Sequence, residues 1–215
     1  MRQNNITMKK ALIILSAILL IASGCKTLKD STKHDNGVVI NGVRWATRNV
    51  DEAGTFAPNP ESAGKFYQWN RKKAWSTTDD EVENWNDTPV EGKMWGKAND
   101  PSPKGWRVPT YKEIESLLDK QKVTSEWTII NGVGGRKFTD KVTGNSIFLP
   151  AVDFRFYSDG SLYKLVNKTG GYYWSSSRDS HIYYFFFYNN NAGTTNGSDN
   201  YADGKSIRSV ANIEY

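Results

Sequence analysis

Cysteine is almost absent from this chain of 215 residues, which contains one, Cys25, together with only two histidines, His34 and His181. A single thiol excludes a disulfide within the chain, and the zinc sites built from closely spaced cysteines and histidines are excluded as well. No Gly-x-Ser-x-Gly elbow occurs, and the glycines of residues 132–135 lack the lysine and the following helix of a phosphate-binding loop. We therefore predict a protein that is not an enzyme and that has no cofactor and no metal ion.

A strong charge of either sign is also lacking. The chain has 28 Lys and Arg and 23 Asp and Glu residues, a formal net charge of +5. Arg2, Lys9 and Lys10 lie in a segment that we expect to be cleaved, which leaves 25 basic and 23 acidic side chains, or +2. A nearly neutral protein has no general attraction for phosphate backbones, so we predict no nucleic-acid partner.

Long apolar runs are missing except at residues 11–22, which follow Lys9 and Lys10. Twelve residues are too few to cross a bilayer comfortably, and a charged start before such a run is typical of a secretion signal. The pattern predicts a signal peptide over residues 1–24, with translation starting at Met1 or Met8.

The run ends in Ala22-Ser23-Gly24-Cys25, which resembles the bacterial lipoprotein box. That resemblance implies that Cys25 is lipidated and becomes the new N-terminus, the alternative being a lone cysteine after an ordinary signal peptide. Residues 26–36 are polar and cannot bury enough surface to fold, so we expect a flexible tether over residues 25–36 and a folded domain over residues 37–215.

The folded part mixes many short strands with little helix. Asn41-Gly42 stands between two short β-rich runs and predicts a hairpin. Thr110 and Glu113 have the spacing of a capping box, and apolar residues at i, i+3, i+4 follow, which predicts a helix from Thr110 to about Lys120. Residues 70–99 show little periodicity and predict a long loop. The pattern indicates an α+β fold with an antiparallel sheet.

Eight tryptophans are the most unusual part of the composition. We expect Trp45, Trp69, Trp106 and Trp174 in the core, because they stand in the six sequence blocks described in the next paragraph. The tryptophans of the long loop, at positions 75, 85 and 95, fit either packing over the core or a surface that stacks on sugars. Trp85-Asn86-Asp87 is similar to half of a lectin calcium site, but the other half is missing.

Six blocks in order carry a family resemblance. They are residues 43–50 (VRWATRNV), 64–69 (GKFYQW), 100–110 (DPSPKGWRVPT), 147–151 (IFLPA), 173–176 (YWSS) and 204–210 (GKSIRSV). Together they resemble the Fibrobacter succinogenes major paralogous domain, which is common in lipoproteins of Bacteroidetes. The resemblance implies a C-type-lectin-like fold with short antiparallel strands, one or two helices and long loops. The family often has a cysteine where Ser102 stands here.

Residues 175–204 contain no Lys, Glu, Gln, Met or Trp and are rich in Asn, Tyr, Ser and Gly. This segment resembles the variable region of diversity-generating retroelement targets, and its composition is similar to that of an antibody paratope. Strand alternation predicts that Tyr183, Phe185 and Phe187 face inward and that Tyr184, Phe186 and Tyr188 face outward. An ordinary hairpin with Asn-Gly turns is the alternative. The predicted ligand-binding residues are Arg178, His181, Tyr184, Phe186, Tyr188, Asn189, Asn190, Asn191, Asn196, Asp199, Asn200 and Tyr201.

These features predict a lipoprotein of the cell envelope, held at the outer membrane by a lipid on Cys25 and either periplasmic or surface-exposed. We expect it to bind an extracellular protein or glycan without catalysis. The alternative is a structural or adhesin subunit of a surface assembly.

Overall fold

The structure is a computed structural model that describes residues 32–164, 170–198 and 200–212. The predicted signal peptide, Cys25 and Asp199 lie outside the described residues. No helix in the described ranges is long and apolar enough to cross a membrane.

The fold is α+β, with small antiparallel sheets and one α-helix in the part of the chain that is described. The elements are β1 (Val38–Ile40), β2 (Val43–Trp45), the 3-10 helix η1 (Lys97–Asn99), β3 (Trp106–Arg107), α2 (Tyr111–Leu118), β4 (Val123–Ile130), β5 (Val133–Asp140), β6 (Ser146–Pro150), β7 (Phe154–Arg155), β8 (Leu162–Tyr163), β9 (Gly170–Arg178), β10 (Ile182–Tyr188), β11 (Ala192–Ser198) and β12 (Val210–Ala211). The order of neighbouring strands is β1-β2-β12-β3 in one sheet, and β11-β10-β9, β4-β5-β6 and β7-β8 in the others.

Two Asn-Gly turns close hairpins. Asn41 and Gly42 have φ values of 47° and 81°, and Asn131 and Gly132 have φ values of 50° and 81°. Positive φ at both central positions is what a type I′ turn requires, and its twist matches that of the strands. The predicted β1–β2 hairpin is confirmed. The second turn joins β4 to β5, which begins at Val133.

The predicted capping box of α2 is confirmed. Thr110 Oγ1 accepts from the Glu113 amide, and the Glu113 carboxylate accepts from the Thr110 amide at 2.7 Å. Arg107 donates to both oxygens of the same carboxylate, at 2.8 and 2.6 Å. The helix ends at Leu118, two residues earlier than expected, and buries Ile114 and Leu117.

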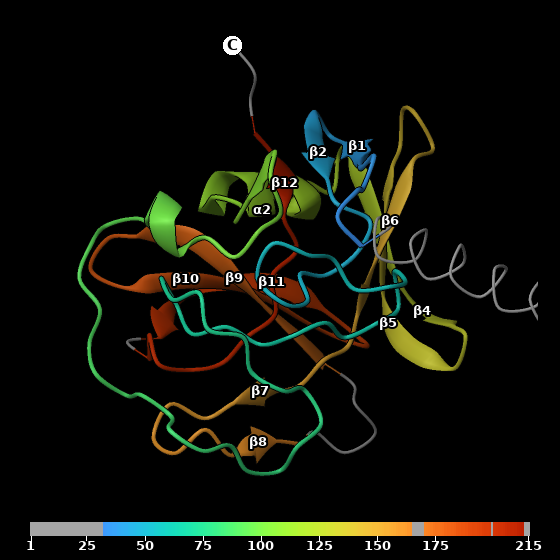
Figure 1. The fold of residues 1–215 in the computed structure, drawn as a ribbon. Helices are drawn as coiled ribbons and strands as arrows, with labels where there is room; N and C mark the ends of the chain where they lie inside the picture. The colour runs from blue at the N-terminus through green and yellow to red at the C-terminus, as the bar shows by residue number, and fades with distance from the viewer. Residues whose placement is uncertain (1–31, 165–169, 199, 213–215) are drawn as a thin grey trace, which may run out of the picture.

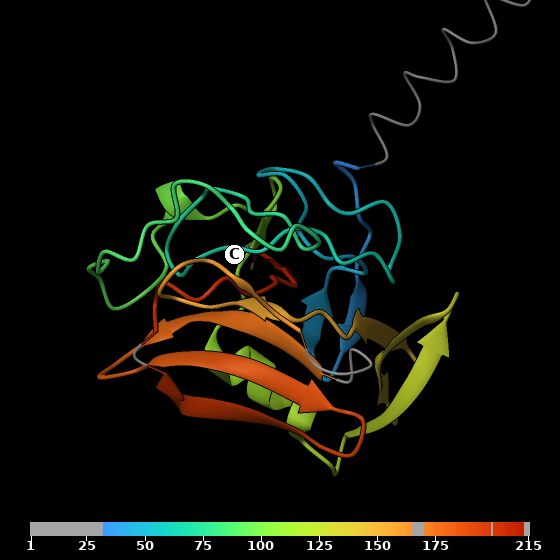
Figure 2. The same cartoon turned by 90° about the horizontal axis from the view of Figure 1, so that it is seen from below.

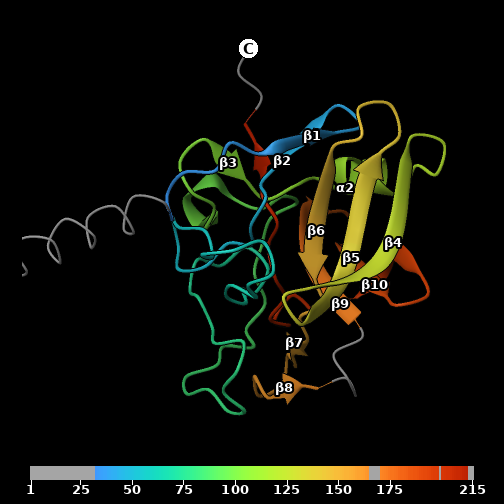
Figure 3. The ribbon, with the colours of Figure 1, turned by 90° about the vertical axis from the view of Figure 1, so that its right-hand side faces the viewer.

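The β9–β10–β11 sheet lies at the centre of the molecule, and α2 packs against its three strands (Figure 1). The side chains of Phe185 and Phe187 enter the same core cluster as Ile114 and Leu117 of the helix. Loops of residues 46–105 gather on one side of this sheet (Figure 2). The β4–β5–β6 sheet lies beside these loops, to which Asn131 of the β4–β5 turn is joined through a hydrogen bond to Glu61, and β7 and β8 lie at the end of the molecule away from β1 and β2 (Figure 3).

The tryptophans of the long loop pack onto the body of the protein. Trp75 and Trp95 are only 5% and 7% exposed, and Trp85 is half-buried with its ring 4.7 Å from that of Trp75. The Trp85 indole also donates to the Tyr157 carbonyl at 2.9 Å. These rings hold the loop in place, so they do not form an open sugar-stacking surface.

The expectation that Trp106 belongs to the core was wrong. Its side chain is half-buried at the edge of a four-stranded sheet, where its ring meets Phe56 edge-on at 5.6 Å. The other three expected core tryptophans are at most 1% exposed. A two-residue strand at a sheet edge has a neighbour on one side only, which leaves Trp106 partly open.

The end of the predicted tether belongs to the fold. Asp35 is 8% exposed, and its carboxylate accepts from the amides of Gly37 and Thr47 at 2.8 and 3.0 Å and from the Thr47 hydroxyl at 2.8 Å. Three residues before Asp35, the Thr32 carbonyl accepts a hydrogen bond from the Phe56 amide at 2.7 Å. A polar segment that cannot form a core of its own is here ordered by hydrogen bonds to the domain.

Candidate functional site

A continuous surface of aromatic rings lies on the central sheet, on the face opposite α2. It starts with the alternation of β10, where Phe185 and Phe187 are at most 1% exposed and point toward the helix. This part of the prediction is confirmed. Tyr184, Phe186 and Tyr188 therefore project from the other face.

A bulge between Ile182 and Tyr184 shifts the register at the start of β10. Tyr183, which was predicted to point inward, is only half-buried. It stacks on Tyr111 of α2 with ring centroids 4.4 Å apart and donates a hydrogen bond to Asp179. Tyr183 therefore lies on the face of the sheet that packs against α2, but at the end of the strand and outside the core cluster of Phe185 and Phe187.

Neighbouring strands extend this row of rings. Antiparallel pairing sets Tyr184 opposite Trp174 and Phe186 opposite Tyr172, so these side chains share one face. Tyr172 touches Phe154 of β7 with centroids 4.8 Å apart, and Phe154 lies 4.7 Å from Tyr163 of β8. We call this surface the aromatic face; its members are Phe154, Phe156, Tyr163, Tyr172, Tyr184, Phe186 and Tyr188.

The rings of the aromatic face are less exposed than strand alternation predicted. Tyr184, Phe186 and Tyr188 are half-buried, and the Tyr188 hydroxyl lies 2.8 Å from the Tyr172 hydroxyl. The reason is that β7, β8 and the segment around residue 205 pack beside the strands. Phe156, at 37%, is the most exposed member, and its neighbour Tyr157 is 46% exposed.

Phe186 lies over the backbone of the edge strand. Its partner in β11 is Gly193, where an added Cβ would come within 3.4 Å of the Phe186 ring. Glycine at this position contributes no side chain of its own beside the half-buried ring. We therefore take Phe186 as a candidate surface for a ligand that stacks on a ring.

A buried lysine lies beneath the rings. Lys205 is 1% exposed, and its Nζ lies 4.2 Å from the centroid of Trp174 and 4.5 Å from that of Tyr184. It forms an ion pair with Asp203, which is 6% exposed. An ammonium over aromatic faces is attracted by the ring quadrupoles.

Burial dominates the electrostatics of this pair. It lowers the pKa of Lys205 to about 8, against the opposing attraction of Asp203. Desolvation likewise raises the pKa of Asp203. Sequence reasoning missed both residues, because nothing in the sequence around Lys205 separates a buried lysine from a solvated one.

The remaining predicted site residues do not meet at one place. Arg178 and His181 lie at one end of β10; Arg178 donates to the Val90 carbonyl at 2.7 Å and covers the Trp69 ring at 5.6 Å. The His181 ring pairs with Ser180 at 2.9 Å. Both residues lie at the end of β10 opposite the turn of residues 189–191 and outside the aromatic face, so their role in binding stays a prediction.

At the other end of β10, Asn189, Asn190 and Asn191 form an exposed turn. Arg136 Nη1 donates to the Tyr188 carbonyl at 3.0 Å and so holds the strand where the turn begins. The turn lies next to Tyr188, so these amides border the aromatic face, and their role in ligand binding stays a prediction.

The last predicted residues lie elsewhere. Asn200 and Tyr201 are half-buried after β11, and the Tyr201 carbonyl accepts from the Trp69 amide at 3.0 Å. Asn196 lies within β11, but its side chain is outside what the structure describes, as is Asp199.

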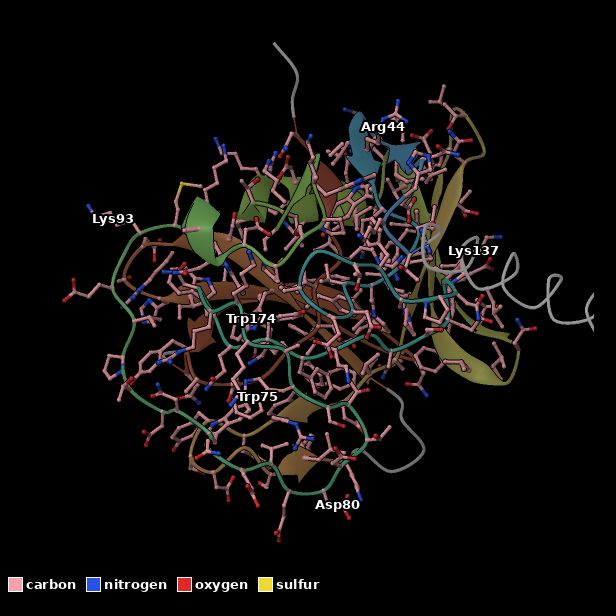
Figure 4. The ribbon with its side chains drawn as sticks, in the orientation of Figure 1. Arg44, Trp75, Asp80, Lys93, Lys137 and Trp174 are labelled. Atoms are coloured by element: carbon pink, nitrogen blue, oxygen red, sulfur yellow. The ribbon has the colours of Figure 1, made fainter. Side chains whose placement is uncertain are left out.

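Metal ligands do not gather anywhere in the described ranges, where no three His, Cys, Asp or Glu side chains form a group that could hold an ion. Trp174 lies near the middle of the molecule, whereas Asp80 and Lys93 lie at its edge (Figure 4). What the aromatic face offers is therefore ring surfaces, phenol hydroxyls and nearby amides.

No family model, curated protein or solved structure matches this chain.

Proposed function

We propose that this protein is a lipid-anchored lipoprotein of the cell envelope that binds a glycan or a protein, without catalysis, through the aromatic face and the adjoining turn of residues 189–191. Its fold would be C-type-lectin-like and its family the Fibrobacter succinogenes major paralogous domain, as the sequence blocks suggest. The lipid on Cys25 would hold it at the outer membrane.

The observation that carries this proposal is the unbroken contact of seven rings from β7 to β10, with Phe156 more than a third exposed. Tyrosine and phenylalanine bring large contact areas at low entropy cost, and amides beside them supply adaptable hydrogen bonds. Such a surface suits sugar rings or the apolar centre of a protein interface.

Residues 175–204 supply the last part of β9, all of β10 and all of β11, so sequence variation there would alter the aromatic face. This placement supports the proposal that the segment is a diversified region. Phe185 and Phe187 would have to stay constant, because they fill the core under α2.

A substitution pair tests the binding surface. Phe156→Ala with Phe186→Ala removes the most exposed ring and the ring over Gly193. On a glycan array and in a screen of purified envelope proteins, we expect the full chain to bind and the double variant to bind at least about tenfold more weakly, a loss of about 1.4 kcal/mol.

The matched control is Ile129→Ala with Val142→Ala. Ile129 lies on β4 and Val142 in the turn after β5, where they are 67% and 89% exposed, so their loss removes exposed apolar surface away from the aromatic face. Both double variants should melt close to the parent. Equal binding by the parent and the Phe156/Phe186 variant would reject this surface as the ligand site.

A further inference from the structure

The two edges of the central sheet β11-β10-β9 are covered to different extents. Along β9, other segments bond to the strand. The Trp174 amide donates to the Ser206 carbonyl at 2.9 Å. The Ser176 amide donates to the Pro109 carbonyl at 2.7 Å. At the opposite edge, β11 pairs with β10 and with no other strand of the described chain. Figure 2 shows β11, in dark red, at the border of the molecule.

The backbone groups that face this open edge follow from the register of β10 and β11. The Tyr188 amide donates to the Asn191 carbonyl at 2.8 Å, so these two residues form a hydrogen-bonded pair at the start of the ladder. In an antiparallel ladder, such pairs alternate with pairs whose amides and carbonyls point away from each other. On β11 the outward-pointing residues are therefore Ala192 and Thr194. Within the described ranges, no segment other than β10 bonds to their backbone.

The open edge lacks the protection that other edges of this chain have. Sheet edges in natural proteins are blocked by charged side chains, by proline or by a covering segment, because an open edge pairs with other chains. β4 carries the charged Glu126, and Asn145 covers β1 by donating to the Val39 carbonyl at 3.3 Å. Residues 192–198 (AGTTNGS) of β11 contain neither a charged residue nor a proline. The register shift lies toward the far end of β11, so its first four residues pair regularly.

We propose that this edge is a self-association surface, at which β11 pairs with β11 of a second copy of this chain. The two strands run antiparallel about a two-fold axis at Thr194. The amide of each Thr194 then donates to the carbonyl of the other, which joins the two sheets into one sheet of six strands.

The chemistry of β11 favours a second copy as the occupant. Thr194 presents one donor and one acceptor on the same side, so the strand is complementary to itself about the two-fold axis. Identical charged strands would repel each other, but β11 has no charge, and opposed threonines are a favourable cross-strand pair. Two short strands bury less surface than the roughly 1,200 Å² of stable complexes, so we expect a weak and reversible dimer.

The dimer would double the binding surface. A two-fold axis perpendicular to the sheet keeps equivalent faces on the same side, so both α2 helices lie on one face and both aromatic faces lie on the other. A ligand with repeated units could then engage both copies and gain avidity. This last consequence rests on the proposed function of the aromatic face, whereas the pairing of the two strands does not.

A charge swap at the two-fold axis tests the pairing and its register. Sedimentation equilibrium of the full chain in density-matched detergent should show monomers and dimers, with a dissociation constant on the order of 100 µM. Thr194→Lys and Thr194→Glu each set like charges opposite one another and should weaken the dimer at least about tenfold. An equimolar mixture of the two variants should associate at least as tightly as the parent, because unlike charges then meet.

Two controls accompany the swap. Thr194→Val keeps the backbone groups and the shape of the side chain, so it should dimerise like the parent. Thr124→Lys and Thr124→Glu place the same charges at an exposed position on β4 and should change nothing, alone or mixed. If the charged Thr194 variants melt well below the parent, hydrogen exchange of the parent decides, because the Thr194 amide should be protected only at high protein concentration.

Three results would overturn the proposal. The first is a parent chain that stays monomeric up to about 1 mM, which would leave the edge of β11 to a strand of another protein. The second is undiminished dimerisation of both charged Thr194 variants. The third is a mixture that associates no better than the separate variants, which would reject a two-fold axis at this residue.

Discussion

Lys205 is a charged residue in a buried environment, with only 1% of its surface exposed. Its ammonium is enclosed by the rings of Trp174 and Tyr184 and by the carboxyl group of Asp203. Removing two charges from water costs several kcal/mol per ion, and the ion pair and rings offset only part of that cost. This desolvation is the main reason that the pKa of Lys205 is lowered and the pKa of Asp203 is raised.

We expect Lys205→Met to lower the free energy of unfolding by about 3–5 kcal/mol, because it leaves a buried carboxyl group without its cation. Lys205→Met combined with Asp203→Asn should recover at least half of that loss, since no buried charge then remains. Urea denaturation at pH 7 measures both. As a control, Lys137→Met breaks a partly exposed pair with Glu126 (3.7 Å) and should cost less than about 1 kcal/mol. A double variant no more stable than the single one would show that the ion pair is not the source of the effect.

At the scale of elements, a pair of hydroxyls joins the residue before β12 to the loop before β3, to which the Asn212 amide also donates a hydrogen bond at the Gly105 carbonyl (2.9 Å). Ser102 Oγ and Ser209 Oγ are 2.8 Å apart although 107 residues separate them in the chain. Ser102 is the position at which the family resemblance implies a cysteine. In this chain the Ser102 hydroxyl forms a hydrogen bond with the Ser209 hydroxyl instead. The neighbouring strand β12 also pairs with β2 and β3.

Ser102→Cys with Ser209→Cys should form a disulfide, because the two side chains already meet. Closing so long a loop stabilises by about 2–4 kcal/mol in typical cases. The oxidised double variant should therefore melt several degrees above its reduced form, with intact-mass analysis confirming the bond. Ser102→Cys alone is the control and should show no such difference. Free thiols in the oxidised sample, or equal melting of both forms, would contradict the side-chain geometry at this contact.

Elements with local signals were predictable from the sequence. The capping box of Thr110 and Glu113 and the Asn41-Gly42 turn act over a few residues, so their chemistry can be read directly. Lys205 and Phe154 could not be assigned to the site, because their neighbours come from β9 and β10. Such pairings depend on how sheets pack, and the strand register itself shifts between Ile182 and Tyr184, beside Tyr183.

For the whole molecule, buried phenols should limit stability in alkali. Desolvation raises the pKa of Tyr173 to about 12, and it raises the pKa of Tyr67 and Tyr172 as well. The folded state therefore keeps protons that the unfolded chain loses near pH 10. Stability from these groups is present below pH 10 and is lost as the pH rises toward the folded pKa values.

We expect the free energy of unfolding to fall steeply above about pH 10, by up to about 1.4 kcal/mol per pH unit for each such tyrosine. The effect of Lys205 on the free energy of unfolding has the opposite sign between about pH 8 and 10, because the pKa of Lys205 is lower in the folded state than in the unfolded chain. Absorbance at 295 nm should show at least these three tyrosines ionising only as the chain unfolds. Tyr172→Phe should make the alkaline loss smaller. If all eleven tyrosines ionised reversibly near pH 10 in the folded protein, the raised pKa values of the buried tyrosines would be ruled out as the cause of alkaline unfolding.

The docking of Thr32 and Asp35 sets how far the domain could stand from a bilayer. Cys25 and Thr32 are seven positions apart, so even a fully stretched chain would reach at most about 25 Å. If Cys25 carries the proposed lipid, the domain is confined to a shallow zone above the headgroups. Only partners that come within that stand-off height, in a narrow range of approach directions, could then be captured.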